Sequence, residues 1–249
     1  MATTTAVSPD APDAEPPLGT MARITGVLFS PSKTFADIAK KPSWAVPFLL
    51  IMALTVVVSA LIVQKTDWRS FFERQMSQNS RFDNMDQAQK DRILESQVTW
   101  APKISYVAIP VVVGVTILFL ALIYWGAFNL FKGAGLRFGT GFAITVYAFV
   151  PGLISSVLAI VVLLIKAKGD VDPEHFLASS LSAYLPDPSP VWLDKLGQSI
   201  EVFWIWSLAL IAIGFSMANP KKIKPGAAYG IVFGLWLLWV VCKVGWAAM

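Results

Sequence analysis

Charge is what this sequence lacks most, since only 14% of its 249 residues are Asp, Glu, Lys or Arg. Soluble domains carry about 25% charged residues, and so thin a polar shell would leave most of a water-exposed surface apolar. Hydrophobic residues make up 55% of the chain, and the mean hydropathy is +0.61. This imbalance indicates a protein that faces lipid over much of its surface.

Cysteine and histidine are nearly absent as well. The single cysteine, Cys242, excludes an internal disulfide and a cysteine metal cluster, and the single histidine, His175, excludes a multi-histidine site. The sequence contains no serine–histidine, paired-carboxylate or metal-ligand spacing that would build a site. We therefore expect a protein that is not an enzyme, with no catalytic residue, no cofactor, no metal and no nucleic-acid partner.

Long apolar runs are what the chain has instead. A helix needs about 20 apolar residues to span a hydrocarbon core of about 30 Å. Five windows without a charged residue approach or exceed that length, namely Pro42–Gln64, Ile104–Phe131, Phe138–Ile165, Val202–Pro220 and Pro225–Cys242. We predict an all-α fold, a polytopic membrane helix bundle with five transmembrane helices at about 45–64, 104–131, 138–165, 200–218 and 226–245.

The remaining segments are short. Residues 1–20 are rich in proline and acidic residues and are predicted to form a disordered tail. We expect residues 44–249 to form the five-helix transmembrane domain. Its outer loops should hold one or two amphipathic helices between residues 67 and 100, and a short helix near residues 190–198.

Basic residues are distributed unevenly between the two sides of the predicted bundle. The flanks 21–43, 132–139 and 218–225 hold nine basic residues in 39 positions, whereas 65–103 and 166–198 hold ten basic and eleven acidic residues in 72. Short basic flanks are cytoplasmic by the positive-inside rule. We therefore expect a cytoplasmic N-terminus and an outside C-terminus.

A segment just before the first window has the features of an amphipathic helix. Ser30 and Pro31 are typical of a helix start, with the hydroxyl as N-cap, and Phe35 and Ile38 fall on one apolar face. We predict an interfacial helix within residues 21–43 that lies on the cytoplasmic leaflet; the alternative is a simple stop that orients the first span. The residues expected at the membrane interface are Pro31, Phe35, Ile38, Lys40, Lys41, Lys132, Arg137, Lys221 and Lys222.

Two rows of small residues are candidates for helix packing. The last window opens with Gly226, Gly230 and Gly234, a double G-x-x-x-G pattern that lets another helix approach closely. The third window offers a possible matching row at Ala148, Gly152 and Ser156. Packing within the bundle is the favoured interpretation, and packing between subunits is the alternative.

Two further segments contain residue types that are found in binding sites. The glycine-rich segment Lys132–Gly141 lacks the G-x-x-x-x-G-K-[ST] spacing of a phosphate-binding loop, so we predict a tight hairpin loop at headgroup level. Tyr147, Pro151 and Ser155 are candidates for polar packing or for an uncharged path through the third helix. Charged residues are missing from the middle of every window, which disfavours an ion-coupled transporter or a proton pump.

Several of these segments together resemble the Yip1 domain, a five-span membrane module found in bacteria and in eukaryotic secretory membranes. The similarity lies in the Ser30–Pro31 helix start, the hairpin loop with Gly133 and Phe138, the stretch VYAFVP at 146–151, and WSLALIAIGFSMANPKK at 206–222. It covers roughly residues 24–245. The resemblance implies a five-span bundle and a bacterial-type member of the family. Together with the scarcity of cysteine, it favours a bacterial inner membrane.

The resemblance says less about partners. Eukaryotic members are associated with Rab-type GTPases and carry an Asp-Leu-Tyr-Gly-Pro motif that the tail of this chain lacks, so a Rab-type partner does not carry over. We predict a non-enzymatic membrane protein that acts in membrane organisation, membrane shaping or partner recruitment. Its expected partners are the lipid bilayer, and a second copy of the chain or other membrane proteins. The alternative is a small transporter, channel or lipid-moving protein with an uncharged polar path.

Overall fold

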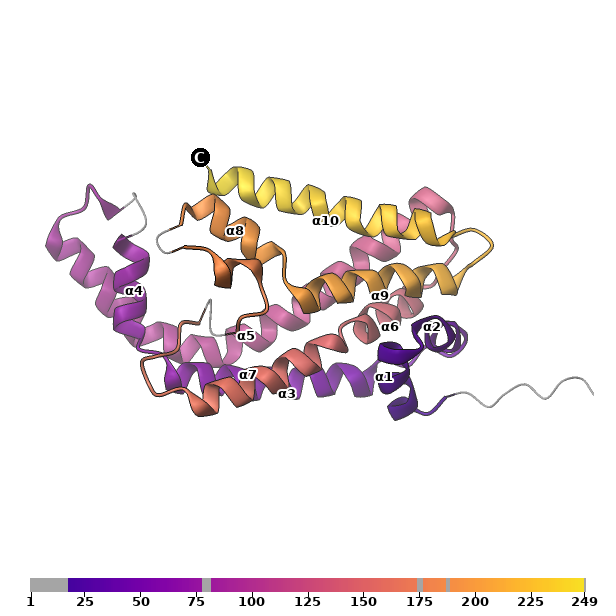
Figure 1. Cartoon of the computed structure of the whole chain (residues 1–249), viewed down its shortest axis with the longest axis horizontal. Coiled ribbons are helices and arrows are strands. Elements are labelled where there is room, and N and C mark those ends of the chain that lie inside the picture. Colours follow the sequence, from indigo (N-terminus) through magenta and orange to yellow (C-terminus); the bar gives the residue numbers. More distant parts are fainter. Residues whose placement is uncertain (1–17, 78–81, 174–176, 187–188, 249) are drawn as a thin grey trace, which may run out of the picture.

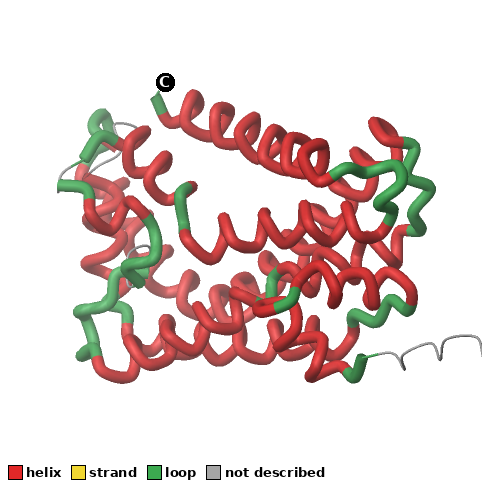
Figure 2. Tube along the Cα trace, turned by 45° about the vertical axis from the view of Figure 1, so that its right-hand side comes forward, coloured by secondary structure: helices red, strands yellow, loops and turns green. Residues whose placement is uncertain are grey.

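The computed structural model describes residues 18–77, 82–173, 177–186 and 189–248, and these residues form an all-helical bundle (Figure 1). Helices run along the long axis of the molecule, and no strand is present in the described parts of the chain (Figure 2). The predicted disordered tail lies almost entirely outside the described residues. The elements are α1 (Thr20–Phe29), α2 (Pro31–Lys40), α3 (Ala45–Lys65), α4 (Trp68–Ser77), α5 (Gln87–Lys132), α6 (Phe138–Ala148), α7 (Pro151–Ile165), the 3₁₀ helix η2 (Leu181–Tyr184), α8 (Val191–Ser199), α9 (Val202–Ala218) and α10 (Pro225–Ala247).

Four helical segments are long and apolar enough to cross a membrane, judged by length and composition alone. They are Ala45–Lys65, Gln87–Lys132, Phe138–Ile165 and Pro225–Ala247. The remaining predicted span corresponds to α9, which has 17 residues and reaches only about 26 Å at 1.5 Å per residue. Among the described residues, length therefore identifies four spans where five were expected.

α9 forms the centre of the bundle. Eight of its residues are buried, over most of the helix circumference, and it packs against α2, α6, α7 and α10. A helix that is apolar all round is typical of such an enclosed position. The rings of Phe215 on α9 and Phe128 on α5 stack with centroids 4.5 Å apart.

The helix predicted just before the first span is present, but its apolar face has a different neighbour. α2 begins at Pro31 as expected, although the Ser30 hydroxyl makes no capping hydrogen bond. Phe35 and Ile38 are fully buried in the core, where α2 packs on α9. The two side chains expected to contact lipid headgroups therefore contact protein, because Gly214 of α9 leaves space for the Phe35 ring.

The end of the molecule opposite α1 and α2 is built from α4, α8, η2 and the beginning of α5 (Figure 1). α5 has 46 residues, about 69 Å at 1.5 Å per residue, so the helix extends well beyond the predicted span 104–131. Phe72 on α4 and Leu94 on α5 are buried, and the two helices pack together. The carboxylate of Asp67, just before α4, accepts hydrogen bonds from Ser70, which lower its pKa. α8 matches the short helix expected near residues 190–198.

The third predicted span is broken in the middle. α6 ends at Ala148 and α7 starts at Pro151, with a turn at Phe149 and Val150. Proline cannot donate the backbone hydrogen bond that would continue the helix. The break lies beside the buried side chain of Tyr147.

Candidate functional site

One end of the bundle collects almost only positive charge. The N-terminal hairpin of α1 and α2, the loop between α5 and α6, and the turn between α9 and α10 all lie there (Figure 1). We call this surface the basic end and define it by Arg23, Lys33, Lys40, Lys41, Lys132, Arg137, Lys221, Lys222 and Lys224. Asp37 is the single acidic residue in the same segments, 21–43, 132–139 and 218–225.

Asp37 is neutralised by a partner inside the hairpin. The Arg23 guanidinium is 3% exposed, and its Nε lies 2.7 Å from Asp37 Oδ2. Arg23 Nη1 also donates to the Lys41 carbonyl at 3.0 Å and to Ser43 Oγ at 2.7 Å. This network joins α1, α2 and the segment that leads into α3. In the sequence, Arg23 counts only as one of the basic flanking residues. Asp37 is the one acidic residue within 21–43, and this was the signal available for the Arg23–Asp37 ion pair.

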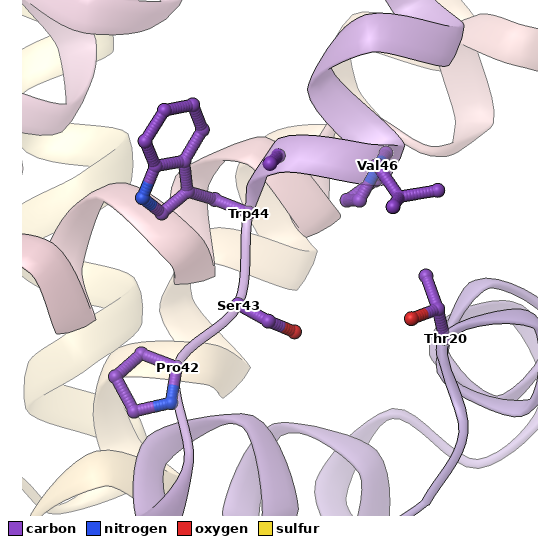
Figure 3. Close-up of a pocket in the computed structure, with 7 residues that line it drawn as sticks. Thr20, Pro42, Ser43, Trp44 and Val46 are labelled. Atoms are coloured by element: carbon purple, nitrogen blue, oxygen red, sulfur yellow. The ribbon is translucent and has the colours of Figure 1, made fainter.

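A shallow depression of about 290 Å³ lies beside this network, between the start of α1 and the start of α3 (Figure 3). The side chains of Thr20 and Ser43 point toward each other across it, and Val46 borders it from α3 (Figure 3). Trp44 and Val46 are exposed. The depression therefore combines hydroxyl groups with apolar side chains, a mixture typical of a surface at the boundary between lipid and water.

The loop between α5 and α6 is a tight hairpin, as predicted, and side-chain hydrogen bonds hold it in place. Gly133 and Gly135 adopt φ values of 55° and 66°, which favour glycine. Asn129 holds the loop from α5, since its Oδ1 accepts from the Leu136 amide at 2.9 Å and its Nδ2 donates to the Leu136 carbonyl at 3.1 Å. The loop thereby presents the exposed side chain of Arg137.

The turn between α9 and α10 is fastened to that loop. Asn219 Nδ2 donates to the Ala134 carbonyl at 2.9 Å, and Lys222 Nζ donates to the Gly133 carbonyl. The two expected interface lysines here are both exposed, and Lys222 also contacts the loop. The basic end is thus a connected surface.

The two rows of small residues do not meet. α10 packs on α9 and α8, and its buried residues are Ala228, Val232 and Val240. Gly226, Gly230 and Gly234 are exposed on another face, where a Cβ atom on any of them would meet no atom within 4 Å. In the second row Ala148 is buried, while Gly152 also has open space and the Ser156 hydroxyl donates to the Gly152 carbonyl. Among the described residues, therefore, no helix packs on the glycine row.

The candidate path residues lie in a closed part of the bundle. Tyr147 is fully buried, and its hydroxyl has no hydrogen-bond partner among the described residues. Pro151 is buried at the start of α7, and Ser155 is half-buried one turn further along. The depression at Thr20–Pro47 and a second one bordered by Thr66 and Lys168 are lined by other residues. No group of three or more His, Cys, Asp or Glu residues that could hold a metal occurs in the described part of the chain.

Comparison with known proteins adds a family to this geometry. Residues 25–244 match the profile of the Yip1 domain. The chain is 26% identical over 212 residues to a protein of Bacillus subtilis (strain 168) described as membrane protein YknW, and the match covers 84% of each chain. No solved structure gives a significant match.

Proposed function

This chain belongs to the Yip1 domain family of membrane proteins, and from that premise we propose that it is a non-enzymatic docking protein within the bilayer. It associates with a second copy of itself, or with a helix of another membrane protein, through the glycine face of α10. Partner recruitment and membrane organisation follow from that association. The observation that carries the proposal is the open row of Gly226, Gly230 and Gly234.

Geometry explains why that row suits a partner helix. Glycines four residues apart share one helix face, and without side chains they let two backbones approach closely. Helices in lipid have no hydrophobic driving force to associate, so close packing supplies the attraction. α10 is also weakly embedded, since only 17% of its most apolar stretch is buried inside the bundle.

The experiment replaces Gly230 with leucine. Its Cβ points into open space, so the bundle should keep its thermal stability while the partner helix is pushed away. Chains fused at the C-terminus to donor or acceptor fluorescent proteins are reconstituted in liposomes, and energy transfer is measured against the protein-to-lipid ratio. We expect Gly230→Leu to weaken association by about tenfold or more, which corresponds to at least about 1.4 kcal/mol.

Gly126→Leu on α5 is the matched control, because that glycine also has open space around its Cβ position but lies on another span. Energy transfer by the control should equal that of the unaltered chain. If the unaltered chain does not self-associate, crosslinking in native membranes tests for a different partner. If Gly230→Leu reduces neither self-association nor crosslinking to a partner, the proposal is overturned.

The same geometry supports a five-span topology. α9 is short, yet it lies beside α10 and ends at the same end of the molecule where α10 begins (Figure 1). We propose that α9 crosses with them, so that the basic N-terminal end is cytoplasmic and the C-terminus lies outside, in a bacterial inner membrane. Reporter fusions at residue 249 that are active on the cytoplasmic side would contradict this orientation.

A second candidate, transport of an uncharged molecule, is supported by the unpartnered Tyr147 hydroxyl beside the break between α6 and α7. Broken helices and unsatisfied polar groups at membrane depth are typical of substrate paths. Flux of small uncharged solutes into liposomes that contain the purified protein tests it. Flux that Tyr147→Phe reduces would support transport, and flux equal to that of empty liposomes would exclude it.

A further inference from the structure

We propose that the basic end is a binding surface for anionic phospholipid headgroups, and that α1 lies among these headgroups in the membrane interface. The inference requires only that the protein is embedded in a bilayer. It does not depend on docking through α10, because the residues concerned lie on different elements.

Charge complementarity carries the proposal. The flanks that form the basic end hold nine basic residues and one acidic residue, and Arg23 already pairs with that acid. The flanks of the opposite end hold ten basic and eleven acidic residues. Even with the three acidic residues of the N-terminal tail added, the basic end keeps an excess of five positive charges. An anionic leaflet attracts such a surface, and each Lys or Arg raises the affinity about fivefold.

Apolar side chains place this charge at the lipid surface. α1 buries Ile24 and Val27 toward the bundle but exposes Met21 and Phe29, at 68% and 83%. Among the described residues of the hairpin, no other large apolar side chain is as exposed as these two. The role predicted for Phe35 and Ile38 on α2 thus passes to α1, whose outer apolar face can enter the interface while nearby lysines meet phosphate groups.

Backbone donors at the same end add to this attraction. α3, α6 and α10 all begin there, and none has a side-chain hydrogen bond that caps its first turn. Of the helices that begin toward the opposite end, α5 and α9 are capped by the carboxylates of Asp86 and Glu201, whereas α8 has no side-chain cap. Backbone amides at helix starts are suited to bind phosphate oxygens. At the basic end, lipid phosphates would accept the hydrogen bonds that a capping side chain accepts elsewhere.

The test compares lipid binding by the full chain and by two charge-removed variants in native mass spectrometry. The probes are dioleoylphosphatidylglycerol, which is anionic, and dioleoylphosphatidylcholine, which has no net charge. The basic-end variant combines the substitutions Lys41→Gln, Arg137→Gln and Lys221→Gln, all at exposed side chains. The control variant removes three exposed charges from the opposite end, with Arg92→Gln, Lys103→Gln and Lys168→Gln.

We expect the unaltered chain to bind phosphatidylglycerol more tightly than phosphatidylcholine. The basic-end variant should lose about fivefold in affinity per residue removed, up to about a hundredfold in total, while the control variant changes little. Raising ammonium acetate from about 0.1 M to about 1 M shortens the Debye length from about 10 to about 3 Å and should reduce the preference.

Two further results decide the outcome. A charge-retaining variant with Lys41→Arg, Arg137→Lys and Lys221→Arg should restore phosphatidylglycerol binding, which separates charge from damage to the fold. Equal affinity of the unaltered chain for the two lipids, or an equal loss in the two charge-removed variants, overturns the proposal.

Discussion

Replacing Phe35 with alanine tests whether α2 belongs to the bundle or to the membrane surface. The ring is fully buried, and its Cδ1 and Cε1 atoms lie 3.0 and 3.2 Å from the position that a Cβ atom on Gly214 would occupy. The ring therefore fills the space above the glycine. A helix that only rested on the leaflet would lose little protein packing on this substitution.

The size of the effect follows from burial. Truncating a buried phenylalanine to alanine costs about 3–5 kcal/mol, through lost transfer energy and the cavity that remains. In a chain of about this size each kcal/mol lowers the midpoint of thermal unfolding by about 2–4 °C. We expect Phe35→Ala to lower that midpoint by about 12 °C, taking the middle of both ranges.

The measurement is thermal unfolding of the purified protein in detergent, followed by the fluorescence of its ten tryptophans. Phe29→Ala is the control, since it removes the same side chain from the same hairpin at a position that is 83% exposed. It should leave the midpoint nearly unchanged. Equal, small shifts for the two variants would refute the packing of α2 on α9.

Three other substitutions probe the same end of the bundle by thermal unfolding. Gly214→Ala should destabilise by about 1–3 kcal/mol, because its new Cβ would overlap Ile144 Cγ2; an unchanged midpoint would show that the site has spare room. Asp37→Ala leaves the guanidinium of Arg23 buried without its carboxylate and should cost about 1.5–3 kcal/mol, whereas the double variant Arg23→Met/Asp37→Ala should recover part of the loss. Asn129→Leu removes two hydrogen bonds to the loop that follows α5 and should cost about 1–3 kcal/mol; trypsin cleavage after Arg137 should become faster.

Much of the architecture could be predicted from the apolar windows, since a charge-free run of membrane length has few other uses. The windows that became α3, the α6–α7 segment and α10 show this, and Pro31 does begin α2. The length of α5 was harder to predict because its first half is polar and amphipathic. Periodicity there indicated helices but did not show that one of them continues into the span.

Neighbours could not be predicted from the pattern. The apolar face of α2 was visible, but lipid and protein are equally apolar coverings, so nothing in Phe35 or Ile38 distinguishes them. The position where Phe35 packs is set by Gly214, but a single glycine in an apolar helix does not show in the sequence that another side chain packs against it. The glycine row of α10 likewise indicates close approach without indicating whether the approaching helix belongs to the same chain.

The packing of α2 on α9 also has a consequence for biogenesis. Phe35 and Gly214 are about 180 residues apart in sequence, so the ribosome synthesises the hairpin long before its docking surface exists. The entropy lost in closing a loop grows only slowly with its length, so the long separation lowers the stability of this contact only a little. It does delay the contact. A nascent chain that stops before α9 lacks the helix on which Phe35 and Ile38 pack, so α2 docks fully only once α9 has been synthesised.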